Sequence, residues 1–255
     1  MRIRFDFELP GGKITLPIHY NYLVQAMIYK SISERLAGFL HSHGFVYEKR
    51  QFKLFTFSKL FGDYRIKKRG PGNTMIDFFS GIYFYLSSSY EEILQEFANR
   101  MVSGTTLILG SQRIYTSSVE VMLPPVFKDG VTTIKILSPV TIRSTWQKKD
   151  GTKKTYYYSP LEKDFSPLIE KNILKKYYSF TGWHPENPEL EISPLYFSEK
   201  RNSHVVVYKD FVIEGYSGIY RLKGSAELKQ FAYDVGLGER NSQGFGMFDK
   251  WKKQE

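Results

Sequence analysis

The order of predicted elements restricts the fold more than any other feature, because the same order occurs on both sides of residues 124–130. This segment, PPVFKDG, has the prolines and the Asp-Gly pair that favour a break between structural units. On each side, apolar residues at spacings typical of strands and helices approximate β-α-β-β-α-β, the ferredoxin-like order. The sequence therefore predicts an α+β protein of two tandem ferredoxin-like (RRM-like) domains, residues 1–124 and 131–255. Each is expected to be an antiparallel sheet with helices on one face.

The first half begins with a strand, since apolar residues from Ile3 to Leu9 alternate with charged ones. A helix follows from about Asn21. Residues 31–34, Ser-Ile-Ser-Glu, have the form of a capping box, which predicts that this helix ends and a second one starts. The second helix is expected to end at Gly44. The other predicted strands are 52–60, 75–86, 106–123, 131–142, 189–197, 203–224 and 244–251, and the other helices are 89–101, 159–180 and 225–236.

Composition favours a polyanionic partner. The net charge is +10, and the chain has 19 tyrosines and 20 phenylalanines that could stack on bases. Basicity alone would equally fit a membrane surface or a ribosome, but no segment is both strongly amphipathic and basic. The absence of cysteine excludes disulfides and thiolate metal sites, and it is compatible with the cytoplasmic location that we expect.

Basic residues gather in three places where they could contact phosphates. Residues 65–73 are expected to form a basic loop, and Asp150-Gly151 predicts the tip of a lysine-rich hairpin. Tyrosines 156–158 beside this hairpin could stack on bases, although such charge runs often only solvate a surface. The candidates are Arg65, Lys67, Lys68, Arg69, Lys148, Lys149, Lys153, Lys154, Lys175 and Lys176.

Residues 236–248, GLGERNSQGFGMF, place four glycines around a polar centre. Asn241 stands where a dinucleotide fingerprint needs its third glycine, and a P-loop Gly-Lys-Ser/Thr is absent. Glycines let the main chain approach a ligand and present N–H groups to an oxyanion. Phosphate binding and a simple turn before the last strand are both open. The candidate phosphate-binding residues are Gly236, Gly238, Arg240, Asn241, Ser242, Gly244 and Gly246.

Acid–base chemistry without a metal is the catalysis that the sequence favours. None of the five histidines lies in a familiar metal-binding motif, and His is the natural acid or base near neutral pH. His41 and His43 are predicted at the C-terminal end of a helix, where the dipole favours imidazolium. They could equally cap carbonyls, Tyr29 could be a core aromatic, and Lys53 could be an ordinary strand lysine.

Three stretches together resemble the CRISPR-associated repeat endoribonucleases, the Cas-six family of the RAMP superfamily. LAGFLHSHGF followed by RQFKLFTFSKL looks like the pattern of the family's first domain. NYLVQAMIYKSIS is similar to its tyrosine-bearing helix, and GLGERNSQGFGMF to its C-terminal glycine-rich signature. The resemblance covers essentially the whole chain, and it implies two ferredoxin-like domains that face each other across a basic cleft.

The resemblance implies cleavage of a long CRISPR transcript within each repeat, without a metal or other cofactor. The 2′-OH attacks the adjacent phosphate and leaves a 2′,3′-cyclic phosphate and a 5′-OH. It matches His41 to the family's general acid/base, Tyr29 to its tyrosine and Lys53 to its lysine, with His43 as the alternative histidine. A repeat-RNA-binding scaffold and a structural subunit of a CRISPR complex are the alternatives. A homodimer and association with other CRISPR-associated subunits are both open.

Overall fold

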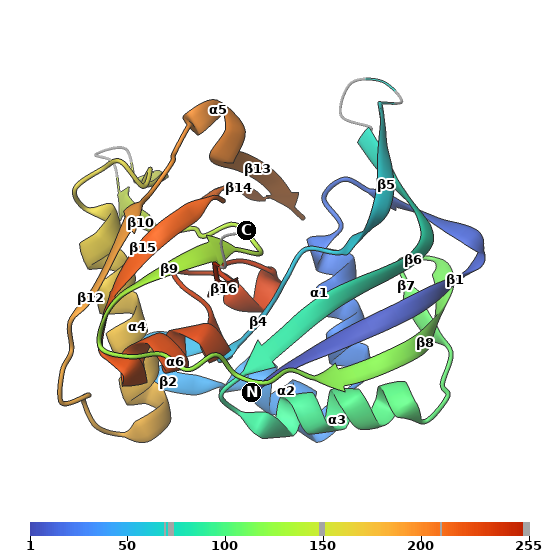
Figure 1. The fold of residues 1–255 in the computed structure, drawn as a ribbon, viewed down its shortest axis with the longest axis horizontal. Coiled ribbons are helices and arrows are strands. Elements are labelled where there is room, and N and C mark those ends of the chain that lie inside the picture. The colour runs from blue at the N-terminus through green and yellow to red at the C-terminus, as the bar shows by residue number, and fades with distance from the viewer. Residues whose placement is uncertain (69, 71–73, 148–150, 210, 252–255) are drawn as a thin grey trace.

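Two antiparallel sheets stand side by side in the computed structural model, which describes residues 1–68, 70, 74–147, 151–209 and 211–251 (Figure 1). The first sheet has the order β4-β6-β1-β8-β7, and β5 pairs with the same strand, β6, as β4 does. Its strands are β1 (Arg2–Pro17), β4 (Phe55–Phe57), β5 (Phe61–Lys68), β6 (Thr74–Ser88), β7 (Leu107–Leu109) and β8 (Gln112–Val121).

The second sheet repeats this plan with the order β12-β15-β9-β16. In both sheets the first and third strands of the repeat, β1 with β6 and β9 with β15, pair at the centre. This confirms the predicted α+β architecture of two ferredoxin-like units, while the limits 1–124 and 131–255 stay a prediction. The strands of the second sheet are β9 (Gly130–Ile136), β12 (Leu190–Pro194), β15 (Ile219–Gly224) and β16 (Phe248–Lys250).

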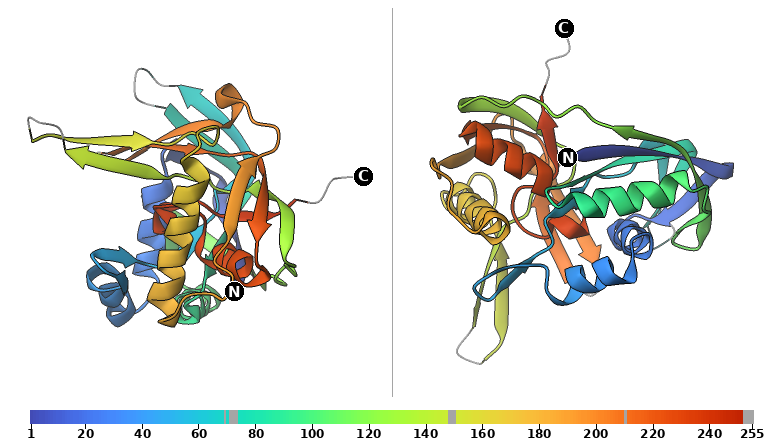
Figure 2. Two further views of the ribbon diagram at one scale, coloured as in Figure 1. Left: turned by 90° about the vertical axis from the view of Figure 1, so that its left-hand side faces the viewer. Right: turned by 90° about the horizontal axis from the view of Figure 1, so that it is seen from below.

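Helices cover one face of each sheet, and the two cores lie under them (Figure 2). Val24, Leu36 and Phe97, from α1, α2 and α3, are fully buried in the first core, and Ile173 and Leu228 are buried in the second. In the described part of the chain, no helix has the length and apolar character needed to cross a membrane. The helices are α1 (Asn21–Lys30), α2 (Glu34–Ser42), α3 (Glu91–Val102), α4 (Phe165–Thr181), α5 (Glu199–Asn202), α6 (Ala226–Val235) and the 3₁₀ turn η1 (Asn241–Gln243).

The predicted break between α1 and α2 is present, but the capping residue is Ser33 and not Ser31. The Ser33 hydroxyl accepts a hydrogen bond from the Leu36 N–H at 3.2 Å. In a capping box the reciprocal acceptor would be the side chain at position 36, which is an apolar leucine. Glu96 of α3 takes that role, and it accepts hydrogen bonds from the Ser33 N–H and hydroxyl at 2.6 and 2.9 Å.

Residues 65–68 were expected in a loop, but they belong to β5, which extends a long hairpin with β6. The alternation of apolar and polar residues that predicts a strand is weak in this part of the sequence, because all but two of the eight residues of β5 are exposed. Other hairpins are inserted into the ferredoxin-like plan: β2 (Phe45–Tyr47) with β3 (Arg50–Phe52), β10 (Arg143–Gln147) with β11 (Lys153–Tyr157), and β13 (Ser203–Tyr208) with β14 (Phe211–Tyr216).

The glycine-rich segment joins the two halves. The Thr56 hydroxyl in β4 donates to the Phe245 carbonyl at 2.9 Å, and the Asn21 amide in α1 donates to the Gln243 carbonyl at 2.9 Å. Gly244 has a φ of +81°, and a Cβ there would overlap the Phe57 ring and lie 2.8 Å from the Asn21 amide nitrogen. The glycine is therefore required by packing between the halves.

Replacing Gly244 by Ala is expected to lower the free energy of unfolding by about 3 kcal/mol, because the methyl group would overpack the contact with Phe57. Gly104→Ala is the matched control, since Gly104 has a similar φ of +70° but open space around it. It should cost only about 1 kcal/mol of left-handed backbone strain. Urea denaturation measures both, and equal losses would contradict the packing argument.

Candidate nucleic-acid interface and active site

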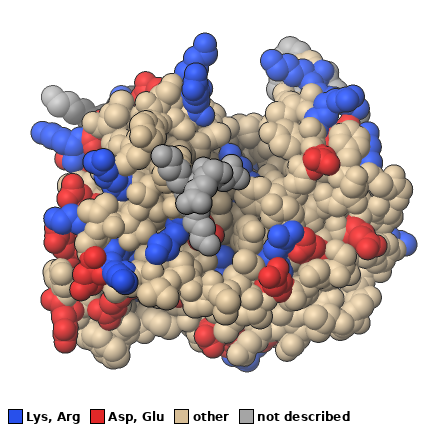
Figure 3. Space-filling model, viewed as in Figure 1, with Lys and Arg blue, Asp and Glu red and all other residues tan. Residues whose placement is uncertain are grey.

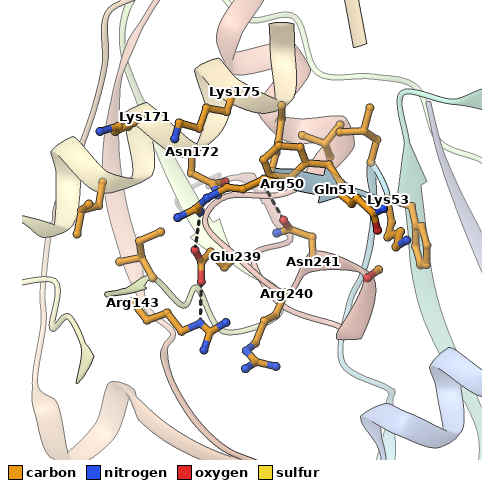
Figure 4. A pocket seen from close by; sticks show the side chains of 18 of the residues that line it. Arg50, Gln51, Lys53, Arg143, Lys171, Asn172, Lys175, Glu239, Arg240 and Asn241 are labelled. Atoms are coloured by element: carbon orange, nitrogen blue, oxygen red, sulfur yellow. Dashed lines mark hydrogen bonds and ion pairs between the residues drawn. The ribbon is translucent and has the colours of Figure 1, made fainter. Parts of the chain in front are cut away.

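A pocket of about 660 Å³ lies between the two halves (Figure 4). One wall is the segment from Arg50 to Phe55, which runs from β3 into β4, and the opposite wall is α4. The glycine-rich segment and β10 close the remaining sides. A single acidic residue, Glu239, lines it against seven basic ones, so the pocket favours an anion. The basic residues are Arg50, Lys53, Arg143, Lys171, Lys175, Lys176 and Arg240.

Glu239 holds two of these cations in place. Its carboxylate accepts from Arg50 of the first half at 3.1 Å and from Arg143 of β10 at 3.0 Å (Figure 4). Among the described residues, Lys53, Lys171, Lys175 and Arg240 have no carboxylate within ion-pair distance. The pocket therefore keeps positive charge that protein carboxylates do not neutralise.

Lys176 organises the glycine-rich segment from inside. The residue is 3% exposed, and its ammonium group donates to the carbonyls of Gly236 and Gly238 and to the Asn241 side-chain oxygen at 2.7–2.8 Å. Burial lowers the pKa of Lys176 to about 7, and the charge of Glu239 partly opposes this shift. Lys176 was expected as a phosphate contact, but its three donors are all directed at the segment itself. Its neighbour Lys175 remains partly exposed.

Asn241 is likewise turned inward. Its side-chain amide donates to the carbonyls of Leu237 and Phe245, both at 3.0 Å. Only the main-chain groups of Asn241 are therefore available to contact a ligand. The N–H groups of Arg240, Asn241 and Ser242 start the η1 turn and have no acceptor among the described residues. The segment thus has main-chain donors left unpaired within the described ranges, although its glycines serve contacts within the protein.

Helix α1 fixes the segment from the other side. The Gln25 amide donates to the Ser242 carbonyl at 2.6 Å, and Tyr208 of β13 donates to the same amide's oxygen. Asn21, Gln25 and Tyr29 stand four residues apart and share a face of α1. Sequence reasoning missed Asn21 and Gln25, and the signal that could have found them is this polar stripe on an otherwise apolar helix.

His41 and Lys53 meet at the C-terminal end of α2, where His41 was predicted to lie. The Lys53 ammonium donates to the His41 carbonyl at 3.2 Å, and partial burial lowers the pKa of Lys53. The His41 and His43 side chains are both exposed, and His43 is the C-cap residue. One side of Lys53 therefore faces the end of α2, and the other lines the pocket.

Tyr29 lies near this region but is largely packed. The centroid of its ring is 6.1 Å from that of Phe55, and Phe55 lines the pocket. The Tyr29 ring packs against the first core. Burial, and secondarily Tyr208, raise the pKa of Tyr29 to about 12. Its hydroxyl therefore stays protonated near neutral pH and can serve as a hydrogen-bond donor.

The remaining basic candidates lie on two projecting hairpins, β5–β6 and β10–β11 (Figure 2). Lys67 is committed to the buried Asp77 at 2.7 Å, whereas Arg65, Lys68, Lys153 and Lys154 are exposed. Arg69, Lys148, Lys149 and Asp150 lie outside the described residues. Lys and Arg side chains stand on both rims of the hollow between the halves (Figure 3).

His204 is held neutral away from this region. Its ring nitrogen is hydrogen-bonded to the Ser217 hydroxyl at 2.7 Å. Burial, and secondarily the charge of Lys59, lower the pKa of His204 to about 4. Across the described ranges, no three His, Asp or Glu side chains are grouped so that they could hold a metal ion.

Two family models match most of the chain: "CRISPR-associated protein Cas6, N-terminal" over residues 15–120, and "CRISPR associated protein Cas6, C-terminal" over residues 122–250. The CRISPR-associated endoribonuclease Cas6 1 of Methanocaldococcus jannaschii is 28% identical over 96% of this chain and 91% of its own length. A Pyrococcus furiosus protein named as endoribonuclease-like is 26% identical over 97% of both chains. A solved Cas6-related protein from Pyrococcus furiosus has the same fold, with a TM-score of 0.84, 24% identity, and coverage of 100% of this chain and 99% of that one.

Lys176→Met is expected to lower the free energy of unfolding by about 3 kcal/mol, because it leaves buried acceptors without a donor. Lys175→Met is the matched control on the adjacent, partly exposed position, and it should change stability by less than about 0.5 kcal/mol. Urea denaturation of both variants tests the assignment. Similar stability in the two variants would show that the three hydrogen bonds contribute little.

Stability should fall as the pH decreases from about 6.5 to about 4, because unfolded His204 takes up a proton in this range while the folded residue does not. His204→Asn keeps a polar group toward Ser217 but cannot titrate. The difference in unfolding free energy between the native protein and His204→Asn should be constant above pH 7 and change progressively below pH 6.5. A constant gap throughout would mean that His204 titrates normally.

Proposed function

The chain belongs to the Cas6 family of CRISPR-associated proteins, and from this premise we propose that it is an endoribonuclease that processes CRISPR repeats. It binds the precursor transcript and cuts it within each repeat, which releases guide RNAs. The observation that carries the proposal is the meeting of Lys53 with the end of α2 that bears His41, at the edge of a cationic pocket. RNA-backbone cleavage needs a proton-transfer group and a cation in that proximity.

The proposed step is an internal transesterification. The 2′-OH oxygen forms a bond to the adjacent phosphorus as its proton is removed, and the bond from phosphorus to the 5′-oxygen breaks. The departing oxygen takes up a proton, so the products are a 2′,3′-cyclic phosphate and a 5′-OH. No water, metal or cofactor is consumed. His41, which the sequence resemblance matches to the family's general acid/base, is proposed to carry out one or both proton transfers.

Lys53 stabilises the extra negative charge that develops on the phosphate oxygens. Only one of its three N–H groups is used by the His41 carbonyl, so the others can turn to the phosphate. Tyr29, protonated at neutral pH, positions the reacting group by donating a hydrogen bond. The N–H groups of Arg240, Asn241 and Ser242 are proposed to hold a neighbouring phosphate, in keeping with the predicted role of the glycine-rich segment.

The RNA on either side of the cut is proposed to lie against the exposed cations of the two projecting hairpins, Arg65 and Lys68 on one and Lys153 and Lys154 on the other. Because such contacts act through charge, each replacement should weaken binding and reduce its salt dependence without altering the cleavage position.

A repeat-RNA-binding scaffold that does not cut is the second candidate. Two observations favour it: a relative is named as endoribonuclease-like, and the Tyr29 ring is largely packed against the core. A scaffold would bind the same RNA through the same cations. The endoribonuclease and the scaffold therefore differ only in whether the bound RNA is cut.

We expect the purified protein to cut its host's repeat RNA at one position in EDTA and to leave a cyclic phosphate. His41→Ala should lower the single-turnover rate by about 10²–10⁴-fold, the usual contribution of a general acid or base, with RNA affinity retained. His43→Ala, two residues away and equally exposed, is the matched control and should cut normally.

Loss of cleavage with His43→Ala alone would move the proton-transfer role to His43. Tight binding by every protein without any cleavage would replace the enzyme by the scaffold. Cleavage that EDTA abolishes would overturn the acid–base mechanism.

A further inference from the structure

We propose that the pocket between α4 and the segment from Arg50 to Phe55 holds one adenine nucleotide of the bound RNA, with Asn172 contacting the base. This inference rests on the proposed function, because it assigns a subsite to the same RNA. It adds a residue that determines which base is accepted, at a place separate from the His41 imidazole.

The first observation is an unsatisfied amide. Asn172 lines the pocket and is 4% exposed, and its side-chain oxygen has no hydrogen-bond donor among the described residues. A buried acceptor without a donor costs about 1–3 kcal/mol. Asn172 occurs between Ile169 and Ile173 on the buried side of α4, where an apolar residue would avoid this cost. A ligand that donates to this oxygen would remove the penalty.

The second observation is the arrangement of charge around Asn172. Lys171 and Lys175 stand one helical turn apart on α4, and both line the pocket without a carboxylate partner in the described chain. Glu239, the acidic residue of the lining, is already occupied by Arg50 and Arg143. A ligand that reaches Asn172 therefore meets two ammonium groups that no described carboxylate neutralises, of which that of Lys175 lies over the Tyr47 ring, and this suits a phosphate attached to the base being bound.

The pocket is large enough for a nucleotide. Its volume of about 660 Å³ lies within the range of about 300–1,000 Å³ that is usual for small-molecule sites. Arg50 extends across the pocket to Glu239, beside Asn172 (Figure 4). The Arg50 side chain is 55% exposed. Phe52 and Leu168 provide apolar surface for the faces of a base.

The chemistry of a carboxamide fits the edge of adenine. Its oxygen accepts and its nitrogen donates, and this pair matches the amino group and ring nitrogen, N6 and N7, that adenine presents side by side. Unsubstituted purine keeps N7 but has no amino group beside it, so it would leave the Asn172 oxygen unsatisfied. A matched bidentate contact is worth about 1–3 kcal/mol of discrimination, or roughly 5- to 150-fold in affinity.

The test measures fluorescence anisotropy with labelled RNA 8-mers of adenosine, of purine riboside, which lacks only the 6-amino group, and of uridine. The native protein should bind the adenosine 8-mer at least about 5-fold tighter than the purine 8-mer. Asn172→Leu, similar in size, should bring that ratio close to one by weakening binding of the adenosine 8-mer more than that of the purine 8-mer. Lys171→Ala, the control one residue away, should weaken binding of all three and preserve the ratio.

Stability provides a second readout. Asn172→Leu should not lower the melting temperature, because it removes an unsatisfied polar group, and a large loss would mean that the amide has a structural partner and would overturn the inference. A ratio near one in the native protein, or a ratio that survives Asn172→Leu, would overturn it as well.

The source of the nucleotide is tested with AMP as a competitor. AMP and unlabelled adenosine 8-mer are compared by the concentration at which each displaces the labelled 8-mer. Equal concentrations, together with loss of AMP competition in Asn172→Leu, would assign the pocket to a free nucleotide. That result would overturn its place in RNA recognition. Repeat cleavage without adenine discrimination would refute this subsite alone, whereas failure to bind repeat RNA would refute the proposed function.

Discussion

The contact of the Lys176 ammonium with three oxygens of the glycine-rich segment is the interaction on which the rest of the site depends. It is buried, and it sits at the centre of a turn whose four glycines adopt left-handed conformations. That turn carries Glu239 and Arg240 and touches α1 and β4 of the other half. Since a charged group inside a protein is costly unless it is fully hydrogen-bonded, the segment can adopt few other shapes around it. The buried Lys176 amine therefore fixes the placement of Glu239 and Arg240, and through Glu239 that of Arg50 and Arg143.

The same segment makes the two ferredoxin-like units one functional body. Neither sheet alone provides the pocket, because its walls come from β3–β4 on one side and from α4 and β10 on the other. Hydrogen bonds from Asn21, Gln25 and Thr56 attach the segment to the first half, while Lys176 attaches it to the second. The position of Lys53 relative to Arg240 is thus set by contacts between the halves.

Periodicity was enough to predict the repeat of the fold in the two halves, and the form of a capping box predicted the break between α1 and α2. Lys175 and Lys176 were both expected as phosphate contacts, although Lys176 stands three residues after Ile173 on the buried side of α4 and Lys175 does not. The capping-box pattern pointed to Ser31 because the matching Glu34 is local, whereas the acceptor for Ser33 is Glu96, sixty-three residues away. The glycines were noticed, but the need for Gly244 comes from Phe57 and Asn21, which no local pattern connects with it. Asn172 went unnoticed because one polar residue in an amphipathic helix is unremarkable until its surroundings are known.

The short helix α2 is held at both ends by side chains from elsewhere in the chain. Glu96 of α3 binds its first turn through Ser33, and Lys53 binds the carbonyl of His41 in its last. A helix of nine residues is unstable by itself in water, so these two attachments, with the buried Leu36 and Leu40, set where it begins and ends. The exposed residues in the middle of α2 contribute little to this placement, and Gly38 has open space around it. Apart from Arg35, which forms ion pairs with Glu92 and Glu96 of α3, the outer surface of α2 is therefore free to diverge in sequence, or to be redesigned, while the imidazole of His41 stays in register.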